Sequence, residues 1–394
     1  MASVFLTGVG RLVTNVGEPI ADAVVAIEDS LITYAGPATD APHQTGDRID
    51  CGGRAIIPGF VDAHTHLVFA GDRSEEFAER LAGRSYSDIA AEGGGILATV
   101  GATRAAGADQ LFSLAAARLW RMIRAGTTTV EIKSGYGLDT ATEVRLLEVA
   151  RRLGEELPVT VKTTFLGAHS IPVEYRQDRQ GYVELVIEEM LPAVVGLADY
   201  CDVFVEDGAF TVDEARRIFT AAASHGMGAR VYAEQLGAGG GAALAAEISA
   251  VSADHLDHVT LDDARALAAA GVTAVLVPGA SYTLGSAPAP ARLLAEAGAT
   301  IALATDCNPG TSYFESMAPI ISLAVVQMGM GVGEAVAAAT LGGARALELD
   351  ERGQIGMGMP ADLVILDAPS ETHLPYRPGT NLVWRTIKEG VAVG

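Results

Sequence analysis

Short apolar runs alternate with longer amphipathic stretches through the middle of the chain. Each run is bounded by glycine, proline or polar residues, a pattern typical of buried strands. We identify eight of these runs, at residues 56–62, 127–132, 159–166, 200–205, 229–233, 248–253, 274–277 and 301–305. Small or apolar positions at helical spacing, mixed with Glu, Asp and Arg, predict helices at residues 141–153, 182–195, 212–223, 261–270 and 291–297.

Strands that alternate with helices predict parallel pairing through right-handed crossovers, and eight such strands predict a closed (β/α)8 TIM barrel. The competing fold is an open, doubly wound parallel sheet. It is the weaker interpretation, because no Gly-x-Gly-x-x-Gly motif follows the first predicted strand. The pattern therefore favours a barrel domain spanning residues 56–352.

Both ends of the chain have β-type patterns. Residues 23–36 resemble a hairpin, and residues 361–367 and 381–388 contain short apolar runs near the other end. Neither end is long enough for a sheet domain of its own. We therefore predict that residues 1–55 and 353–394 together form one small composite β-sandwich domain.

The composition suits a large hydrophobic core, since 49% of the 394 residues are hydrophobic and 19% are charged. The formal net charge is 27 − 49 = −22, which argues against a nucleic-acid partner and against attachment to anionic lipid. Three separated cysteines, Cys51, Cys201 and Cys307, suggest neither a disulfide framework nor a thiolate zinc site. We expect a cytoplasmic protein, because there is no signal-like amino terminus and no apolar run of about 18 residues.

Polar or titratable residues follow almost every predicted strand. His64 and His66 end the first run, where alternation directs both imidazoles to one side, and Asp306 follows the eighth run. Histidine nitrogens and carboxylate oxygens are ligands for zinc or iron. The other strand ends carry Lys133, Tyr136, His169, Glu206, Asp207, Tyr232, Glu234, Gln235, His255, Ser281 and Tyr282. Any one of them could be an ordinary surface or core residue, but together they favour an active site at the carboxyl ends of the strands.

Longer motifs are similar to a known family. The His64-x-His66 pair, together with Asp306, resembles the amidohydrolase superfamily. Glu131-Ile-Lys-Ser-Gly-Tyr-Gly137 and Ala304-Thr-Asp-Cys-Asn-Pro-Gly310 resemble its imidazolonepropionase family more specifically. Further similar strings, which extend the resemblance over nearly the whole chain, lie at residues 66–77, 164–169 and 252–255.

The resemblance implies hydrolysis of the cyclic amide of 4-imidazolone-5-propanoate to N-formimidoyl-L-glutamate, a reaction of histidine degradation. It also implies a small-molecule substrate, one zinc or iron ion per chain, a composite β domain and a homodimer. Two alternatives are open. One is a related amidohydrolase or deaminase that acts on another small heterocycle, and the other is a barrel that binds a ligand or partner without turnover.

The reaction explains why these residue types are needed. Opening a cyclic amide at neutral pH requires a nucleophile stronger than water, and a bound metal lowers the pKa of its water to about 7 while it polarises the carbonyl. We expect His64, His66 and Asp306 to hold the metal. Asp306 is also expected to take the proton of the attacking water and deliver it to the leaving nitrogen. His255 is assigned to hydrogen-bonding the hydroxide or the developing oxyanion.

Substrate recognition requires a cation for the propanoate and polar groups for the ring. Arg73 follows His66 by seven residues, and a guanidinium can bind a carboxylate through two parallel hydrogen bonds. The competing interpretation of Arg73 is a solvated loop arginine beside Asp72, Glu75 and Glu76. Positions that contact substrate in the family correspond to Tyr136, His169, Gln235, Asn308, Gly310 and Thr311. The three glycines at 93–95 are predicted to be a lid hinge, because they lack the Lys-Ser/Thr of a phosphate-binding loop.

The fifth predicted strand departs from the family. The family pattern Arg-Val-His-Ala-Glu/Asp-Gln has a third histidine ligand where this chain has Tyr232, in Arg230-Val-Tyr-Ala-Glu-Gln235. Four outcomes are open: a ferric site that includes tyrosinate, His255 as a replacement ligand, weak binding through three ligands, or Tyr232 filling the barrel mouth in a variant with damaged activity. The fourth strand ends in Val205-Glu-Asp-Gly208, without the lysine that often bridges paired metals, so one metal is expected.

Overall fold

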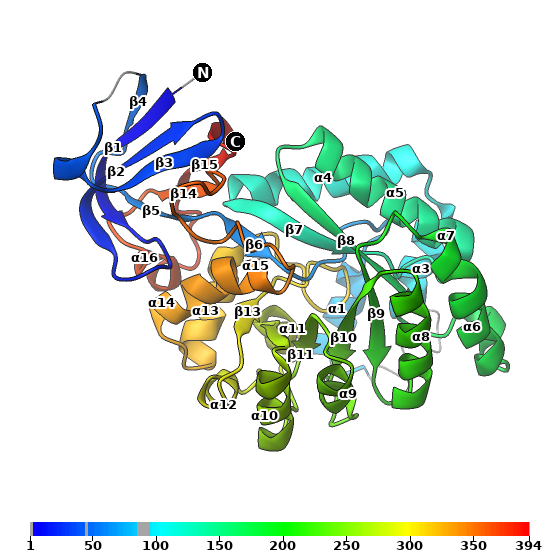
Figure 1. Ribbon diagram of the computed structural model, residues 1–394. Coiled ribbons are helices and arrows are strands. Elements are labelled where there is room, and N and C mark those ends of the chain that lie inside the picture. Colours follow the sequence, from blue (N-terminus) through cyan, green and yellow to red (C-terminus); the bar gives the residue numbers. More distant parts are fainter. Residues whose placement is uncertain (1–2, 44–45, 85–93, 394) are drawn as a thin grey trace.

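Two eight-stranded sheets organise the chain, one made from its middle and one from its two ends (Figure 1). The computed structural model describes residues 3–43, 46–84 and 94–393. Gly93 of the predicted hinge lies outside these residues, whereas Gly95 precedes helix α3 (Ile96–Ala105) with a φ of 74°. Within the described part of the chain, no helix is long and apolar enough to span a bilayer.

The central sheet is a nearly closed parallel barrel, and the predicted fold class is confirmed. Its strands follow one another in chain order as β6 (Phe60–Asp62), β7 (Thr127–Lys133), β8 (Thr160–Ala168), β9 (Tyr200–Val205), β10 (Gly228–Ala233), β11 (Ser252–His255), β12 (Thr273–Leu276) and β13 (Ile301–Leu303). Beyond β6 and β13, the Asp306 backbone N–H donates to the His64 carbonyl over 2.9 Å, and Thr65 forms a parallel bridge with Cys307. The residues that follow the strands are thereby collected at one mouth of the barrel.

Helices cover the outside of the barrel (Figure 1). α8 (Val212–Ser224) and α10 (Leu261–Ala270) lie where they were predicted, because a threonine caps the amino end of each and Gly271 ends α10 in the left-handed conformation. The predicted helix at 182–195 is divided into α6 (Arg179–Leu185), the π-helical segment η3 (Val186–Met190) and α7 (Leu191–Ala193). The other helices include α1 (Ser74–Leu81), α4 (Ala108–Arg124), α5 (Thr140–Glu156), α9 (Gly241–Glu247), α11 (Pro278–Leu284), α12 (Ala291–Glu296), α13 (Met317–Gln327), α14 (Val332–Ala337), η4 (Ala338–Gly342), α15 (Gly343–Arg345) and α16 (His373–Tyr376).

The second sheet combines strands from both ends of the chain, as predicted. The amino-terminal segment provides β1 (Ser3–Leu12), β2 (Ile20–Glu28), β3 (Leu31–Pro37), β4 (Asp47–Asp50) and β5 (Ala55–Pro58), and the carboxyl-terminal segment provides β14 (Leu363–Leu366), β15 (Val383–Lys388) and β16 (Val391–Val393). The join between the two ends is the antiparallel pair of β5 and β14. Hydrogen bonds connect all eight strands into a single sheet.

The terminal sheet is tied to the barrel by buried polar contacts. The Lys388 ammonium group donates to Oγ1 of Thr160, at the start of β8, and to a carboxylate oxygen of Asp362, each over 2.8 Å. The hydroxyl of Thr386 donates to the carbonyl of Ile123 at the end of α4. These contacts lie at the amino-terminal end of the barrel, away from the mouth that holds the histidines.

The first predicted barrel strand, residues 56–62, is divided at Gly59. Residues before the glycine form β5 of the terminal sheet, and residues after it form β6 of the barrel. The N–H of Gly59 donates to the Asp362 carbonyl, and a Cβ atom at this position would lie 2.2 Å from Oγ1 of Thr128. A Pro-Gly pair can interrupt an apolar run in this way, because proline lacks an N–H donor and glycine fits a close backbone approach.

The strand predicted at 248–253 is displaced along the chain. The observed β11 spans Ser252–His255. Ile248 instead closes helix α9, and Ser249 follows it with a φ of 51°, in a turn. The apolar residues at 248–251 therefore belong to the helix end and the connection, which places Asp254 and His255 inside the strand.

Candidate active site

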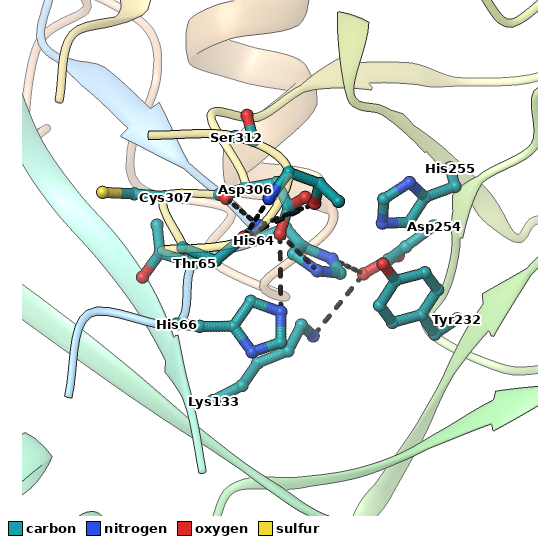
Figure 2. Close-up of polar contacts among 12 residues, drawn as sticks. His64, Thr65, His66, Lys133, Tyr232, Asp254, His255, Asp306, Cys307 and Ser312 are labelled. Atoms are coloured by element: carbon teal, nitrogen blue, oxygen red, sulfur yellow. Dashed lines mark hydrogen bonds and ion pairs between the residues drawn. The ribbon is translucent and has the colours of Figure 1, made fainter. Parts of the chain in front are cut away.

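His64, His66 and Asp306 lie together at the barrel mouth, fully or almost fully buried. Nε2 of His64 is 3.6 Å from Oδ1 of Asp306, and Nε2 of His66 is 3.4 Å from the same oxygen. Figure 2 shows the three side chains pointing toward one another. The hydrogen bond between the backbones of His64 and Asp306 fixes their relative positions.

Several atoms of this group have no hydrogen-bond partner among the described residues, although they are buried. They are Nε2 of His64, Nδ1 of His66, both ring nitrogens of His255 and both carboxylate oxygens of Asp306. Buried polar atoms are normally paired, so the convergence of those of His64, His255 and Asp306 indicates a missing partner such as a cation. Ligand atoms around a tetrahedral zinc, with bonds of about 2.0–2.1 Å, lie roughly 3.3 Å apart. The residues therefore fit a metal ion, and ligand atoms of His64, His255 and Asp306 also lie within 4.8 Å of one another.

The imidazoles have the protonation state that metal ligands require. Burial lowers the pKa of His64 to about 4 and holds that of His66 well below its usual value. Burial likewise lowers the pKa of His255. Neutral imidazoles keep a lone pair for a cation, whereas imidazolium has none.

Tyr232 occupies the end of β10 beside these residues. Its ring is stacked on that of His255, with centroids 4.0 Å apart and an interplanar angle of 5°. Its hydroxyl donates to Oε1 of Gln235 over 3.0 Å. Burial, reinforced by the charge of Asp306, raises the pKa of Tyr232 well above its usual value. The side chain is therefore a neutral phenol whose proton is directed to Gln235.

Five charged residues lie beneath the histidines inside the barrel, and we call them the buried ion cluster: Glu131, Lys133, Asp202, Arg230 and Asp254. Lys133 is 2.9 Å from Glu131 and 2.8 Å from Asp202. Arg230 is 3.0 Å from Asp254, which in turn accepts a hydrogen bond from His64. Of these residues, only Lys133 was singled out from the sequence. The available signal was charge at alternate positions within otherwise apolar strands, which places such residues on the inner barrel face.

Two buried acids of the cluster, Asp202 and Asp254, differ in the direction of their pKa shifts. Burial raises the pKa of Asp202 to about 6, against the opposing effect of Lys133. Burial acts in the same direction on Asp254, but Arg230 and Lys133 hold its pKa well below the usual value. Asp254 is thus the carboxylate that this environment keeps charged.

Tyr136 and His169 line the opposite side of the histidine pair. The His169 ring is stacked on His66 with centroids 5.2 Å apart, and the Tyr136 ring lies 5.6 Å from His66. Nδ1 of His169 lies 3.0 Å from the Gly135 carbonyl, which can only accept, so this nitrogen carries the proton. Nε2 of His169 is therefore left as an acceptor.

Arg73 lies at the start of α1, beside the loop that follows Asp306. The guanidinium is 10% exposed and pairs with Glu76 through Nε at 2.9 Å and Nη2 at 2.5 Å. The interpretation of Arg73 as a solvated arginine is therefore wrong, although its pairing with Glu76 is real. A Cβ atom on Gly310 would lie 2.5 Å from Nη1 of Arg73, so a side chain at this position would require the guanidinium to move.

Asn308 shapes the same loop from inside. Its Oδ1 accepts the backbone N–H groups of Gly310 and Thr311, both at 2.8 Å, and its amide donates to the Asp306 carbonyl. These hydrogen bonds of Asn308 fix the conformation of the loop that follows Asp306 and lies beside Arg73. The structure brings all twelve predicted site residues to the mouth of the barrel or to the loops around it.

Comparisons with known proteins agree with this architecture. The sequence profile described as "Amidohydrolase family" matches residues 55–393. An imidazolonepropionase of Symbiobacterium thermophilum is 47% identical, with 98% of this chain and 96% of that protein covered. One from Salinispora arenicola is 48% identical, with 99% of each covered.

Solved structures share the fold at much lower identity. A 5-methylcytosine deaminase from Klebsiella pneumoniae has a TM-score of 0.77 and 18% identity over 99% of this chain and 98% of its own. An adenosine deaminase from Xanthomonas campestris, with bound zinc, has a TM-score of 0.74 and 18% identity over 99% and 92%. These similarities show the fold, and the sequence relatives show the family. The chain belongs to the amidohydrolase family and, within it, to the imidazolonepropionases.

Proposed function

We propose that the protein hydrolyses the cyclic amide of 4-imidazolone-5-propanoate to N-formimidoyl-L-glutamate, with one zinc or iron ion per chain held by His64, His66 and Asp306. The observation that carries the proposal is the convergence of buried atoms without partners, Nε2 of His64 and both oxygens of Asp306, within the described residues. A bound metal ion supplies Lewis-acid polarisation of the amide carbonyl and lowers the pKa of water to about 7.

Proton transfer is assigned to Asp306. Its Oδ1 faces both imidazoles, which leaves Oδ2 for the proton of the attacking water and for its later delivery to the leaving ring nitrogen. His255 is neutral and fully buried, and we assign its ring N–H to the developing oxyanion.

Substrate orientation is assigned to the groups that surround the histidine pair. Glu76 occupies Nε and Nη2 of Arg73, and we assign the propanoate to Nη1, which faces Gly310. The ring contacts are assigned to Tyr136, His169, Gln235, Asn308, Gly310 and Thr311. The acceptor nitrogen of His169 suits a ring N–H of the substrate.

Tyr232 is assigned to positioning rather than to metal binding. Its hydroxyl proton is committed to Gln235, and its ring lies flat against His255. A phenol is a poor ligand unless a metal displaces its proton. The three-ligand site is therefore favoured over a ferric tyrosinate site, and a reduced metal affinity follows from the missing nitrogen ligand. A homodimer is an expectation from the family resemblance, and a cytoplasmic location is an expectation from the sequence pattern.

A substrate comparison tests the proposed function. Purified, metal-loaded protein is incubated with 4-imidazolone-5-propanoate and, separately, with a 4-imidazolone that lacks the propanoate. Ring opening is followed by the loss of imidazolone absorbance and by mass spectrometry of the product. Turnover of the first compound with strong preference over the second is expected. Equal turnover of both would favour a related amidohydrolase with another heterocyclic substrate, and binding without turnover would favour a barrel impaired by Tyr232.

A further inference from the structure

The hydrogen bond between His64 and Asp254 is the closest contact of a proposed metal ligand with the buried ion cluster. Nδ1 of His64 lies 2.6 Å from Oδ2 of Asp254, and neither side chain is exposed. A charged carboxylate can only accept, so Nδ1 carries the proton and Nε2 carries the lone pair. Nε2 is the nitrogen that faces Asp306.

Asp254 is held in place on every side. Nη2 of Arg230 lies 3.0 Å from Oδ2, the Lys133 ammonium group lies 3.6 Å from the same oxygen, and the Ser252 hydroxyl donates to Oδ1 over 2.5 Å. Arg230 is itself anchored, because it donates to the backbone carbonyls of Ala63 at 2.7 Å and Ala346 at 2.6 Å. The carboxylate is therefore fixed in position and in charge.

The charges of the cluster do not balance within it. Lys133 and Arg230 are two cations, whereas Glu131, Asp202 and Asp254 are three carboxylates, all with side chains at 0% exposure. Lys133 already pairs closely with Glu131 and Asp202. Asp254, which pairs with Arg230, is the member of the cluster whose carboxylate contacts His64 (Figure 2).

We infer that Asp254 is a positioning residue for the metal centre. Through Nδ1 of His64 it fixes the tautomer and ring orientation, and its charge makes Nε2 a more basic ligand. Outer partners of this kind typically change metal affinity by about 10- to 100-fold. This inference rests on the proposed metal set of His64, His66 and Asp306.

The first test needs no variant. Histidine is labelled with ¹⁵N, and the zinc-loaded protein is studied by long-range ¹H–¹⁵N NMR. The expected spectrum has a proton on Nδ1 of His64 and zinc on Nε2. Zinc on Nδ1, or a proton on Nε2, would overturn the inference. This result is independent of turnover.

The second test compares two buried acids of the same cluster. Asp254→Asn removes the charge that contacts His64, whereas Asp202→Asn removes a charge that contacts Lys133 and the backbone of Tyr232 but no proposed ligand. Zinc affinity is measured by competition with a chromophoric chelator, and folding by circular dichroism. Asp254→Asn is expected to weaken zinc binding by about 10- to 100-fold, and Asp202→Asn is expected to weaken it much less.

The outcomes separate this inference from the proposed function. If the unmodified protein binds zinc and opens the imidazolone while Asp254→Asn binds zinc equally well, Asp254 has no positioning role and the function stands. Equal weakening by both variants would also reject the positioning role, because general loss of the cluster would explain it. If the unmodified protein binds no zinc, both ideas fail. If the Asp254→Asn variant does not fold, the NMR measurement on the unmodified protein decides whether Asp254 is a positioning residue.

Discussion

The ring of Tyr232 lies parallel to the ring of His255, with their centroids 4.0 Å apart. His255 has a φ of 78°, a left-handed conformation that a residue other than glycine adopts at a cost. The phenol ring thus packs against a histidine whose ligand atom already lies within 4.8 Å of those of His64 and Asp306. Tyr232, at the position where the family pattern has a histidine, thus supports the ring of His255 by stacking.

Replacing Tyr232 with histidine is expected to strengthen metal binding and raise kcat. The change adds a neutral nitrogen ligand where the chain has a phenol. We expect metal affinity to rise by about tenfold or more, which corresponds to at least about 1.4 kcal/mol. Metal content after dialysis and turnover of 4-imidazolone-5-propanoate are measured for both proteins. Equal occupancy and equal kcat would show that this position is not at the metal.

Tyr232→Phe is the matched control. It keeps the stacked ring and removes only the hydroxyl that donates to Gln235. Metal affinity is therefore expected to be unchanged. A ferric form is also examined by visible absorption, where a bound tyrosinate would give a charge-transfer band that Tyr232→Phe would abolish. Such a band, with loss of metal in the phenylalanine variant, would identify Tyr232 as a ligand after all.

Arg73→Ala is expected to act mainly on substrate binding. A lost hydrogen bond to a carboxylate costs about 1.5 to 3 kcal/mol, which is roughly tenfold to a hundredfold in affinity. KM is measured for the imidazolone, with Asp306→Ala as a comparison that should abolish turnover. Glu76→Gln keeps the arginine but weakens its ion pair, and it controls for disturbance of α1. An unchanged KM for Arg73→Ala would show that the propanoate is bound elsewhere.

Purified protein is expected to hold one tightly bound metal ion per chain. Lys133, the lysine nearest the site, is engaged by Glu131 and Asp202 and so does not bridge a pair of metals. Elemental analysis against protein concentration gives the count. Two ions per chain, at the separation of about 3.5 to 4 Å found in paired sites, would contradict the single-metal assignment.

Asp362→Ala is expected to destabilise the fold without direct effect on the site. Asp362 is 5% exposed, and it pairs with Lys388, which is 7% exposed, and with Arg352. Breaking a buried pair typically costs about 3 to 5 kcal/mol, because a buried charge loses its partner. The free energy of unfolding is measured in urea. Glu247→Ala breaks an exposed pair with Arg216 and should cost at most about 1 kcal/mol, so equal losses would contradict the role of burial.

The barrel could be predicted from the sequence because its strands and helices differ in the spacing of their apolar residues. They also differ in the residues that bound each segment. The terminal sheet was predictable from β-type patterns at both ends. The division of the first strand at Gly59 was not, since it depends on contacts with Asp362 and Thr128, which are distant in sequence. Similarly, Ile248 has the character of a strand residue but ends a helix.

The histidine and aspartate candidates were found because they stand at strand ends. Asp254 was not predicted as a site residue because it lies inside a strand. The functional role predicted for this segment was given to the next residue, His255. Its role depends on a contact with His64 that spans 190 positions of the chain. Alternation shows which residues face the barrel interior, but it does not show which charges meet there.

The assignment of the metal ion to His64, His66 and Asp306 underlies the ring-opening activity proposed for the chain. It is tested most directly by removing the metal with a chelator, restoring zinc or iron(II) in stoichiometric amounts, and following imidazolone absorbance together with formation of N-formimidoyl-L-glutamate. We predict loss of turnover on removal, recovery with one equivalent of metal per chain, and no recovery in Asp306→Ala. Full turnover by metal-free protein, or recovery in Asp306→Ala, would contradict the claim.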